Sequence, residues 1–412
     1  MRIGDIKMAK FRDILGLLLQ SLLYSISFFV PKNKTIWIFG SWTGNTFSDN
    51  SKYLYLHIVE KHPEIQCVYI CKDRKVVENL IKKNKEAYYY YSIKGCFLAM
   101  RASVAFVTSS HSDVNAFCCA RILYVQLFHG TPIKKIYEDD SIQNGTRIPK
   151  WKRFLVKKIF KYLDGVGQND YITIASPNVA ASFETAFNTT RNRMLVTGLA
   201  RTDAYVKLSN NNYIINLKNR IDGPLIAYLP THRNYGVHIE GYIDIMANLY
   251  YINEMLKENN VYMLYKPHFN EMKNFENIES EYDHIIVPED DECMSDVYAF
   301  TPYCDLLITD YSSVYLDYLL MDKPIVFFIY DFENYSKLER EFYYDYNQVT
   351  PGPKCYNWID TIDEVSRLLK NDDTSKHRSF ICNIFNEYKD GNSCERIYEE
   401  VSSIINSKGV KM

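Results

Sequence analysis

The chain has 412 residues, which is long enough for two α/β domains that each bury a core of their own. Its formal net charge of −2 excludes a nucleic-acid binder that relies on bulk positive charge, and its 47% hydrophobic content is that of a globular protein. The ten cysteines form no CxxC pair, and most of them stand inside apolar runs. We therefore expect reduced core thiols in a cytoplasmic protein, with neither a zinc site nor a disulfide framework.

The N-terminal segment, residues 1–31, combines a basic flank with an apolar stretch. Residues 14–30 carry no charge and follow the basic side chains of Arg2, Lys7, Lys10 and Arg12. The stretch is short for a membrane span and lacks the small-residue cleavage site of a signal peptide. We interpret it as an apolar helix on the cytoplasmic membrane surface, with an ordinary buried helix as the alternative.

From residue 34 the pattern alternates between strands and helices, which is typical of parallel α/β sheets. The first series predicts strands at residues 35–39, 67–71, 104–107, 122–127, 171–175 and 195–197, with helices at 50–61 and 177–187. The second predicts strands at 225–229, 261–265, 285–287, 306–308 and 325–329, with helices at 239–258, 359–371 and 377–405. Between the two series, residues 207–222 are polar and rich in turn formers, so we expect a linker there.

These elements predict two doubly wound, Rossmann-type domains that face a cleft. The expected boundaries are 32–206 for the first domain, 207–222 for the linker, 223–375 for the second domain and 376–412 for a C-terminal helix.

A turn at the end of the predicted strand 306–308 is the first candidate site. Asp310, Ser312 and Ser313 supply side-chain oxygens where a helix begins, and Ser313 and Asp317 share one face of that helix. The turn lies at the carboxyl end of a parallel strand, where α/β sheets bind ligands, and a helix N-terminus with hydroxyls suits phosphate. A capped helix without a ligand is the alternative.

A histidine lies two residues beyond the end of another predicted strand. His129 comes after the strand 122–127 and is followed by Gly130, which allows close approach of the backbone. A neutral imidazole is the natural general base for an alcohol near pH 7, although a lone histidine at a strand end is more often a structural hydrogen-bonding group.

Basic side chains follow several other predicted strands. Arg201, Arg233, Lys266 and His268 are the side chains in question, and together with the helix N-terminus they favour binding of a pyrophosphate. Asp310 and Asp317 have no third carboxylate near them in the pattern, so we expect a site without a metal.

Taken together, these residues resemble the CDP-glycerol glycerophosphotransferase family, the teichoic-acid and capsule polyol-phosphate transferases and polymerases. The resemblance covers residues 34–354. Its motifs are residues 47–54, 129–135, 198–203, 230–233, 266–268, 309–313 with Asp317, 342–345 and 351–353. Phe128, Ala200 and His232 depart from the usual Trp, Pro and aromatic residue of the family, beside the expected site.

The resemblance implies a GT-B-like fold, in which the first domain serves the acceptor and the second binds the donor. It implies a CDP-glycerol or other CDP-polyol donor, no further cofactor, and a lipid-linked or polysaccharide acceptor at the inner face of the membrane. By the same resemblance His129 is the catalytic base and Asp317 belongs to the site. Because Asp317 lies inside the predicted helix, we expect it to act in catalysis by orienting His or Ser groups and not as a second base. The predicted donor-binding residues are Gly130, Thr131, Pro132, Arg201, Pro230, Thr231, Arg233, Lys266, Pro267, His268, Thr309, Asp310, Ser312 and Ser313.

Two other functions remain open from the sequence. A GT-B glycosyltransferase that uses a nucleotide sugar would need a similar pyrophosphate site but would break a C–O bond. A non-enzymatic membrane-surface partner of a capsule assembly complex would bind the donor without turnover.

Overall fold

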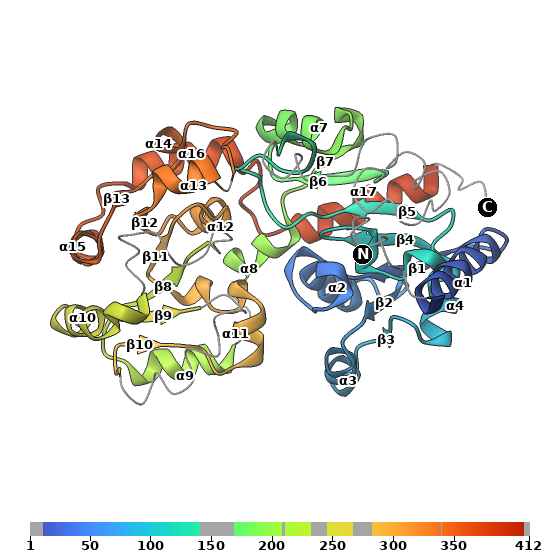
Figure 1. Cartoon of the computed structure of the whole chain (residues 1–412), viewed down its shortest axis with the longest axis horizontal. Helices are drawn as coiled ribbons and strands as arrows, with labels where there is room; N and C mark the ends of the chain where they lie inside the picture. The colour runs from blue at the N-terminus through green and yellow to red at the C-terminus, as the bar shows by residue number, and fades with distance from the viewer. Residues whose placement is uncertain are drawn as a thin grey trace. The chain divides into compact units, whose positions relative to one another are not determined.

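The computed structural model describes residues 11–140, 169–207, 211–231, 245–266, 282–338 and 340–407. Internal contacts divide the chain into two compact units (Figure 1). The first unit comprises Met1–His129, Gln143–Asp203 and Asn392–Met412, and the second comprises Gly130–Ile142 and Ala204–Gly391.

The first unit is built on a parallel sheet, as the sequence predicts. In its described part, seven strands follow the order β3-β2-β1-β4-β5-β6-β7. The strands are β1 (Asn33–Phe39), β2 (Gln66–Cys71), β3 (Ala87–Tyr89), β4 (Ala102–Val107), β5 (Leu123–Gln126), β6 (Tyr171–Ile174) and β7 (Met194–Val196). The helices are α1 (Phe11–Ser27), α2 (Asp49–Lys61), α3 (Arg74–Lys82), α4 (Ile93–Arg101), α7 (Ala180–Phe187) and α17 (Ser393–Ser407).

Both faces of this sheet are buried, which explains why its strands are continuous apolar runs. Successive β1 side chains point to opposite faces, so Trp37 and Phe39 belong to one core cluster and Ile36 and Ile38 to the other. Helices α2, α3 and α17 pack on the first face, and α4 packs on the second.

The second unit repeats the plan. In its described part, six parallel strands follow the order β10-β9-β8-β11-β12-β13. The strands are β8 (Leu225–Leu229), β9 (Tyr262–Tyr265), β10 (Ile285–Ile286), β11 (Leu306–Thr309), β12 (Ile325–Phe328) and β13 (Lys354–Cys355). The helices are α8 (Asp203–Val206), α9 (Asn212–Arg220), α10 (Ile245–Glu258), α11 (Asp291–Ser295), α12 (Val314–Tyr318), α13 (Phe332–Leu338), α14 (Tyr346–Val349), α15 (Trp358–Lys370) and α16 (Ser375–Phe385).

The expected linker, residues 207–222, is wrong in part because it contains helix α9. The side chain of Asn211 accepts a hydrogen bond from the Ile214 N–H at 3.1 Å and so caps the helix, while Ile214 and Leu217 are buried. Asn212, Asn216 and Asn219 occupy the exposed side of this amphipathic helix.

The C-terminal region also differs from the single expected helix. Two helices, α16 and α17, replace it, and the break between them contains Gly391 with a φ of +68°. Helix α17, red in Figure 1, belongs to the first unit, where Ile397 and Val401 share a core cluster with Leu54 and Ile58 of α2. Apolar spacing predicts a helix but not the sheet against which it packs.

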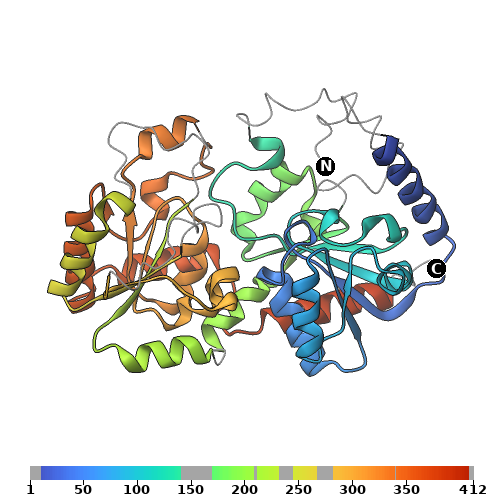
Figure 2. The same cartoon turned by 60° about the horizontal axis from the view of Figure 1, so that its bottom comes forward.

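Helix α1 lies along the outside of the first unit, where it is the dark blue helix of Figure 2. Leu23 and Tyr24 pack against the core cluster that includes Leu98 and Phe117, so one side of the helix is attached to the unit. Among the residues that the structure describes, no helix has both the length and the apolarity that a membrane crossing requires.

Candidate active site

The order of the first sheet reverses between β1 and β4, and the loops that follow these two strands meet there. The Trp42 N–H donates to Thr108 Oγ1 at 3.3 Å, and the Thr43 N–H donates to Asp113 Oδ1 at 2.7 Å. Ligands of doubly wound sheets bind at such reversal points, outside the carboxyl ends of the strands.

Asp113 holds the two loops together. Besides the Thr43 N–H, its carboxylate accepts the N–H groups of Thr108 and Ser109 at 2.7 and 2.8 Å and the Ser109 hydroxyl at 2.5 Å. The side chain is fully buried, so these donors compensate the desolvation of its charge. The resulting loop position fixes the carbonyl group of Thr108.

His129 stands at the end of the neighbouring strand β5, as predicted. Its Nδ1 lies 3.1 Å from the Thr108 carbonyl oxygen, and because a carbonyl can only accept, Nδ1 carries the proton. The lone pair is therefore on Nε2, for which the described residues provide no hydrogen-bond partner. The Trp42 ring lies 4.9 Å from the imidazole, centroid to centroid. Burial lowers the pKa of His129, although the Asp49 carboxylate opposes part of this shift. Because the pKa is lowered, the ring is neutral at pH 7.

The turn that carries His129 is strained and is held from both sides. Phe128 has a φ of +51°, which is unfavourable for a bulky residue. The Asn50 amide donates to the Phe128 carbonyl at 2.8 Å, and Arg201 Nη1 donates to the His129 carbonyl at 2.9 Å. Arg201 also pairs with Asp49 Oδ1 at 2.9 Å, and both side chains are buried. Arg201 therefore supports the turn in this structure, whereas its predicted contact with the donor stays a prediction.

The second sheet reverses its order between β8 and β11, and the predicted residues of these strands meet there. Thr231 donates to Asp310 from its N–H at 2.9 Å and from its hydroxyl at 2.6 Å. The Thr309 hydroxyl donates to the Leu229 carbonyl at 2.8 Å. Through these hydrogen bonds the buried Asp310 carboxylate links the ends of β8 and β11. Pro230 stands between Leu229 and Thr231 in the sequence.

Lys266 and two serines complete the described part of this edge. Lys266 directly follows β9, and burial lowers its pKa, while the Asp296 carboxylate offsets part of that shift. Ser312 and Ser313 are half-buried, and Ser313 is the residue before α12. Helix α12 has only five residues, so the dipole expected from a helix N-terminus is small here, and binding of an anion by this turn stays a prediction.

Asp317 lies in α12 and is buried. Its Oδ2 accepts a hydrogen bond from the Tyr298 hydroxyl at 2.5 Å. This partner gives Asp317 a structural role, and its catalytic role stays a prediction.

The motif at residues 129–135 is divided between the two units, with the boundary directly after His129. Gly130, Thr131 and Pro132 belong to the second unit, and Thr131 is buried there. The segment that follows pairs with residues 341–343: the Lys135 N–H donates to the Glu341 carbonyl at 2.7 Å, and the Tyr343 N–H donates to the Ile133 carbonyl at 2.8 Å. This pairing explains why residues 130–142 leave the expected first domain.

The structure thus assembles most of the predicted site residues into two groups, one at the reversal point of each sheet. Arg233, Pro267 and His268 lie outside the described residues and remain predictions. Trp42, Thr108 and Asp113 were missed because they act through loop geometry and a backbone carbonyl. Asp49 and Asn50 stood inside the recognised motif at residues 47–54, which was the signal that could have found them.

Comparison with known families now tests the expected resemblance. The family model described as CDP-glycerol:poly(glycerophosphate) glycerophosphotransferase matches residues 22–403. The chain belongs to this family. It is 28% identical over 382 residues to a teichoic acid glycerol-phosphate transferase of Staphylococcus aureus, covering 90% of this chain and 93% of that protein. It is 26% identical to a teichoic acid poly(glycerol phosphate) polymerase of Bacillus spizizenii, covering 95% and 98% of the two chains.

Solved structures support the fold. The wall teichoic acid polymerase TagF matches with a TM-score of 0.77 at 23% identity, over 97% of this chain and 98% of that one. A putative UDP-N-acetylglucosamine 2-epimerase from Listeria monocytogenes matches with a TM-score of 0.55 at 14% identity, over 91% and 98%. The predicted family and enzyme class, a CDP-glycerol glycerophosphotransferase, are confirmed, as are the two parallel-sheet Rossmann-like domains.

Proposed function

We propose that the chain transfers a polyol phosphate, glycerol phosphate first of all, from a CDP-polyol to a hydroxyl of a lipid-linked or polysaccharide acceptor and releases CMP. The observation that carries this proposal is the imidazole of His129, whose Nδ1 is held by Thr108 so that Nε2 is left to accept a proton. Membership of the family supports the donor class. Relatives are named for both glycerol phosphate and ribitol phosphate, so the polyol is the first property to be measured.

In the proposed reaction, the acceptor oxygen attacks the phosphorus that bears the polyol. The hydroxyl proton passes to Nε2 of His129, and a P–O bond forms to the acceptor. The bond from this phosphorus to the bridging oxygen of the pyrophosphate breaks, and CMP leaves with that oxygen and the electron pair. No oxidation state changes, and the CDP-polyol is the only co-substrate. Catalysis therefore rests on positioning and on stabilisation of negative charge at the phosphate oxygens.

The second sheet supplies the groups for that charge. Lys266, the hydroxyls of Ser312 and Ser313, and Thr231 stand at the ends of β9, β11 and β8, and we assign them to the donor diphosphate. On the basis of the family resemblance, we also assign Arg233 and His268 to the donor diphosphate. This assignment corresponds to a GT-B-like arrangement, with the acceptor on the first domain and the donor on the second.

The exposed side of α1 supports a peripheral position on the cytoplasmic face of the membrane. Leu18, Leu19 and Leu22 are 59%, 56% and 56% exposed, and Phe29, just beyond the helix, is 82% exposed. Leucines on one helix beside a basic N-terminal sequence suit insertion into an anionic lipid surface. Such a position would bring the enzyme to a lipid-linked acceptor of teichoic-acid-like or capsule polymer synthesis.

Co-sedimentation with phosphatidylglycerol vesicles tests this position. A double variant, Leu18→Ser with Leu22→Ser, is expected to lose most of the bound fraction. A matched control, Tyr250→Ser with Tyr251→Ser, removes two exposed aromatic rings (64% and 70%) from α10 and is expected to bind like the wild type. Equal binding by the wild type and the α1 variant would remove the membrane proposal and leave the transfer reaction untouched.

CMP release tests the reaction itself. We expect release from CDP-glycerol or CDP-ribitol that rises when a lipid-linked or oligosaccharide acceptor is added. If nucleotide sugars are the donors that respond to acceptor, the chain is a glycosyltransferase instead. If donors bind but nothing turns over with any acceptor, the enzymatic proposal is wrong.

A further inference from the structure

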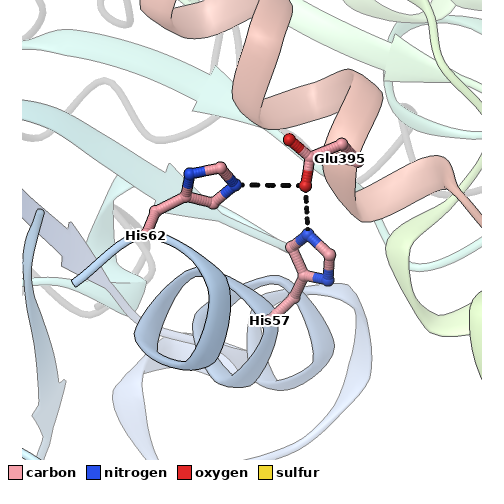
Figure 3. A group of neighbouring side chains, drawn as sticks. All are labelled: His57, His62 and Glu395. Atoms are coloured by element: carbon pink, nitrogen blue, oxygen red, sulfur yellow. Dashed lines mark hydrogen bonds and ion pairs between the residues drawn. The ribbon is translucent and has the colours of Figure 1, made fainter. Parts of the chain in front are cut away.

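Two histidines and a glutamate converge on one point of the first unit, on α2 and α17 (Figure 3). Nε2 of His57 and Nε2 of His62 lie 2.7 and 3.1 Å from the same oxygen, Oε2 of Glu395. His57 lies in the second half of α2, His62 directly follows that helix, and Glu395 lies in the first turn of α17. The residues are 338 and 333 positions apart in sequence, so no spacing motif reveals the cluster.

The three side chains bring together the atom types that bind transition metals. One ligand atom from each residue lies within 4.8 Å of the others, and this is a His₂Glu set with both imidazoles directed by Nε2. Zinc binds such nitrogen and oxygen atoms at about 2.0–2.1 Å, so neighbouring ligand atoms in a tetrahedral site are roughly 3.4 Å apart. The two observed N···O distances need to grow by roughly 0.7 Å for His57 and 0.3 Å for His62 to admit the ion.

The other ring nitrogen of His62 faces a carboxylate, as is common for metal-bound histidines. Nδ1 of His62 lies 3.5 Å from Oε1 of Glu64, and the Tyr398 hydroxyl donates to that same oxygen at 2.8 Å. The Tyr398 ring also stacks on His62, with centroids 3.5 Å apart. Metal-bound imidazoles characteristically donate their other N–H to a carboxylate, which fixes the ring orientation.

A bound ion and a pair of neutral imidazoles place the proton of His62 on different ring nitrogens. Two neutral imidazoles could each donate an Nε2 proton to Glu395. His62 would then present an unprotonated Nδ1 to the Glu64 carboxylate, which is unfavourable because both groups are acceptors. An ion on Nε2 leaves the proton on Nδ1, where it can point toward Glu64. A doubly protonated His62 is the remaining alternative, and it requires no metal.

We propose that His57, His62 and Glu395 bind one divalent transition-metal ion, with zinc the best match, which fastens α17 to α2. The side chains of these residues are 17%, 16% and 35% exposed, so an ion can enter from solvent and a water molecule can fill a fourth position. Apolar contacts between α2 and α17 form a rigid base beneath the site.

The site is separate from the proposed reaction but is connected to it through α2. Asp49 and Asn50 at the start of α2 hold Arg201 and the turn of His129. Eight residues separate Asp49 from His57, which is about 12 Å along a helix. The ion therefore stabilises the helix that supports the proposed base, and it takes no part in phosphate transfer.

Zinc binding to the full-length, chelator-stripped chain tests the proposal. We expect one zinc ion per chain in competition with a chromogenic chelator, with Kd below roughly 1 µM, and a rise in Tm of a few degrees. His57→Gln keeps an N–H donor toward Glu395 but is a poor zinc ligand, and Glu395→Gln likewise keeps the shape, so both are expected to fold and to lose the ion. His377→Ala, on the exposed side of α16, is the matched control and retains it.

Cobalt replaces zinc in a second measurement, because the chain also contains ten thiols. A cobalt spectrum without a thiolate charge-transfer band assigns the ion to nitrogen and oxygen ligands. Zinc binding that survives in both His57→Gln and Glu395→Gln would overturn the proposal. So would a wild-type Tm that does not respond to zinc, which would leave the cluster as a hydrogen-bonded clamp.

Discussion

Replacing Asp113 with asparagine is expected to destabilise the first unit and slow the reaction together. The carboxylate accepts three backbone N–H groups and the hydroxyls of Thr108 and Ser109, shared between its two oxygens. Whichever way an amide is turned, its NH₂ faces at least one of those N–H groups. The loss of a hydrogen bond to a buried charge, with its donor left unsatisfied, costs about 1.5–3 kcal/mol.

The kinetic effect should appear in kcat and not in the KM for the donor. Asp113 touches no substrate in this account but positions the Thr108 carbonyl, which orients His129. Misplacement of a base by a fraction of an ångström lowers kcat by roughly ten- to a hundredfold. Urea unfolding followed by circular dichroism measures the first effect, and acceptor-dependent CMP release measures the second.

Asp73→Asn is the matched control, because Asp73 caps α3 at an exposed position and asparagine caps a helix equally well. If the stability of Asp113→Asn lies within about 0.5 kcal/mol of this control, which is the usual range for surface substitutions, and kcat stays at the wild-type value, Asp113 does not position His129.

Further predictions concern His129, Arg201 and Lys266. Burial lowers the pKa of His129 from 6.5, and the neutral form is the base. We therefore expect kcat/KM to rise with pH to a plateau, with the midpoint of the rise below pH 6.5. A midpoint above pH 6.5 would contradict the assignment of His129 as the base. Arg201→Ala leaves the buried Asp49 carboxylate without its ion-pair partner, so we expect the free energy of unfolding in urea to fall by about 3–5 kcal/mol. Arg191→Ala removes an exposed ion pair and should lower it by less than about 1 kcal/mol. Equal losses in the two variants would contradict a supporting role for Arg201. Lys266→Met should raise the KM for the CDP-polyol about ten- to a hundredfold with little change in the free energy of unfolding, and an unchanged KM would exclude Lys266 from the donor site.

The sheets were predictable because their strands are buried on both faces. Ile36 to Phe39 and Leu306 to Ile308 are continuous apolar runs bounded by polar turns, and such runs have few other ways to bury themselves. The edge strands β3 (Ala87–Tyr89) and β13 (Lys354–Cys355) were missed because they are short and lack the aliphatic run that marks the equally short β10 (Ile285–Ile286). Helix α9 was missed because the cap supplied by Asn211 looks like a turn when only the sequence is read.

The site was predictable where the side chain itself carries the chemistry. His129, Lys266 and the two serines lie within four residues of the carboxyl end of a strand, and this position marks them. Asp113 acts through backbone groups of a neighbouring loop, and the His57 cluster joins residues from opposite ends of the chain. Neither Asp113 nor the His57 cluster shows a local sequence pattern, so both could be recognised only in the folded structure.

We propose that His129 drives transfer of the β-phosphate of the donor. The most direct measurement is a single turnover with CDP-glycerol labelled with ³²P at its β-phosphate, in the presence of acceptor, for the wild type and His129→Ala. We predict that the label moves to the acceptor, that the released CMP is unlabelled, and that the variant is slower by about a hundredfold or more with the donor still bound. Label that stays with the nucleotide would show C–O cleavage, and a variant of wild-type rate would remove His129 from the mechanism.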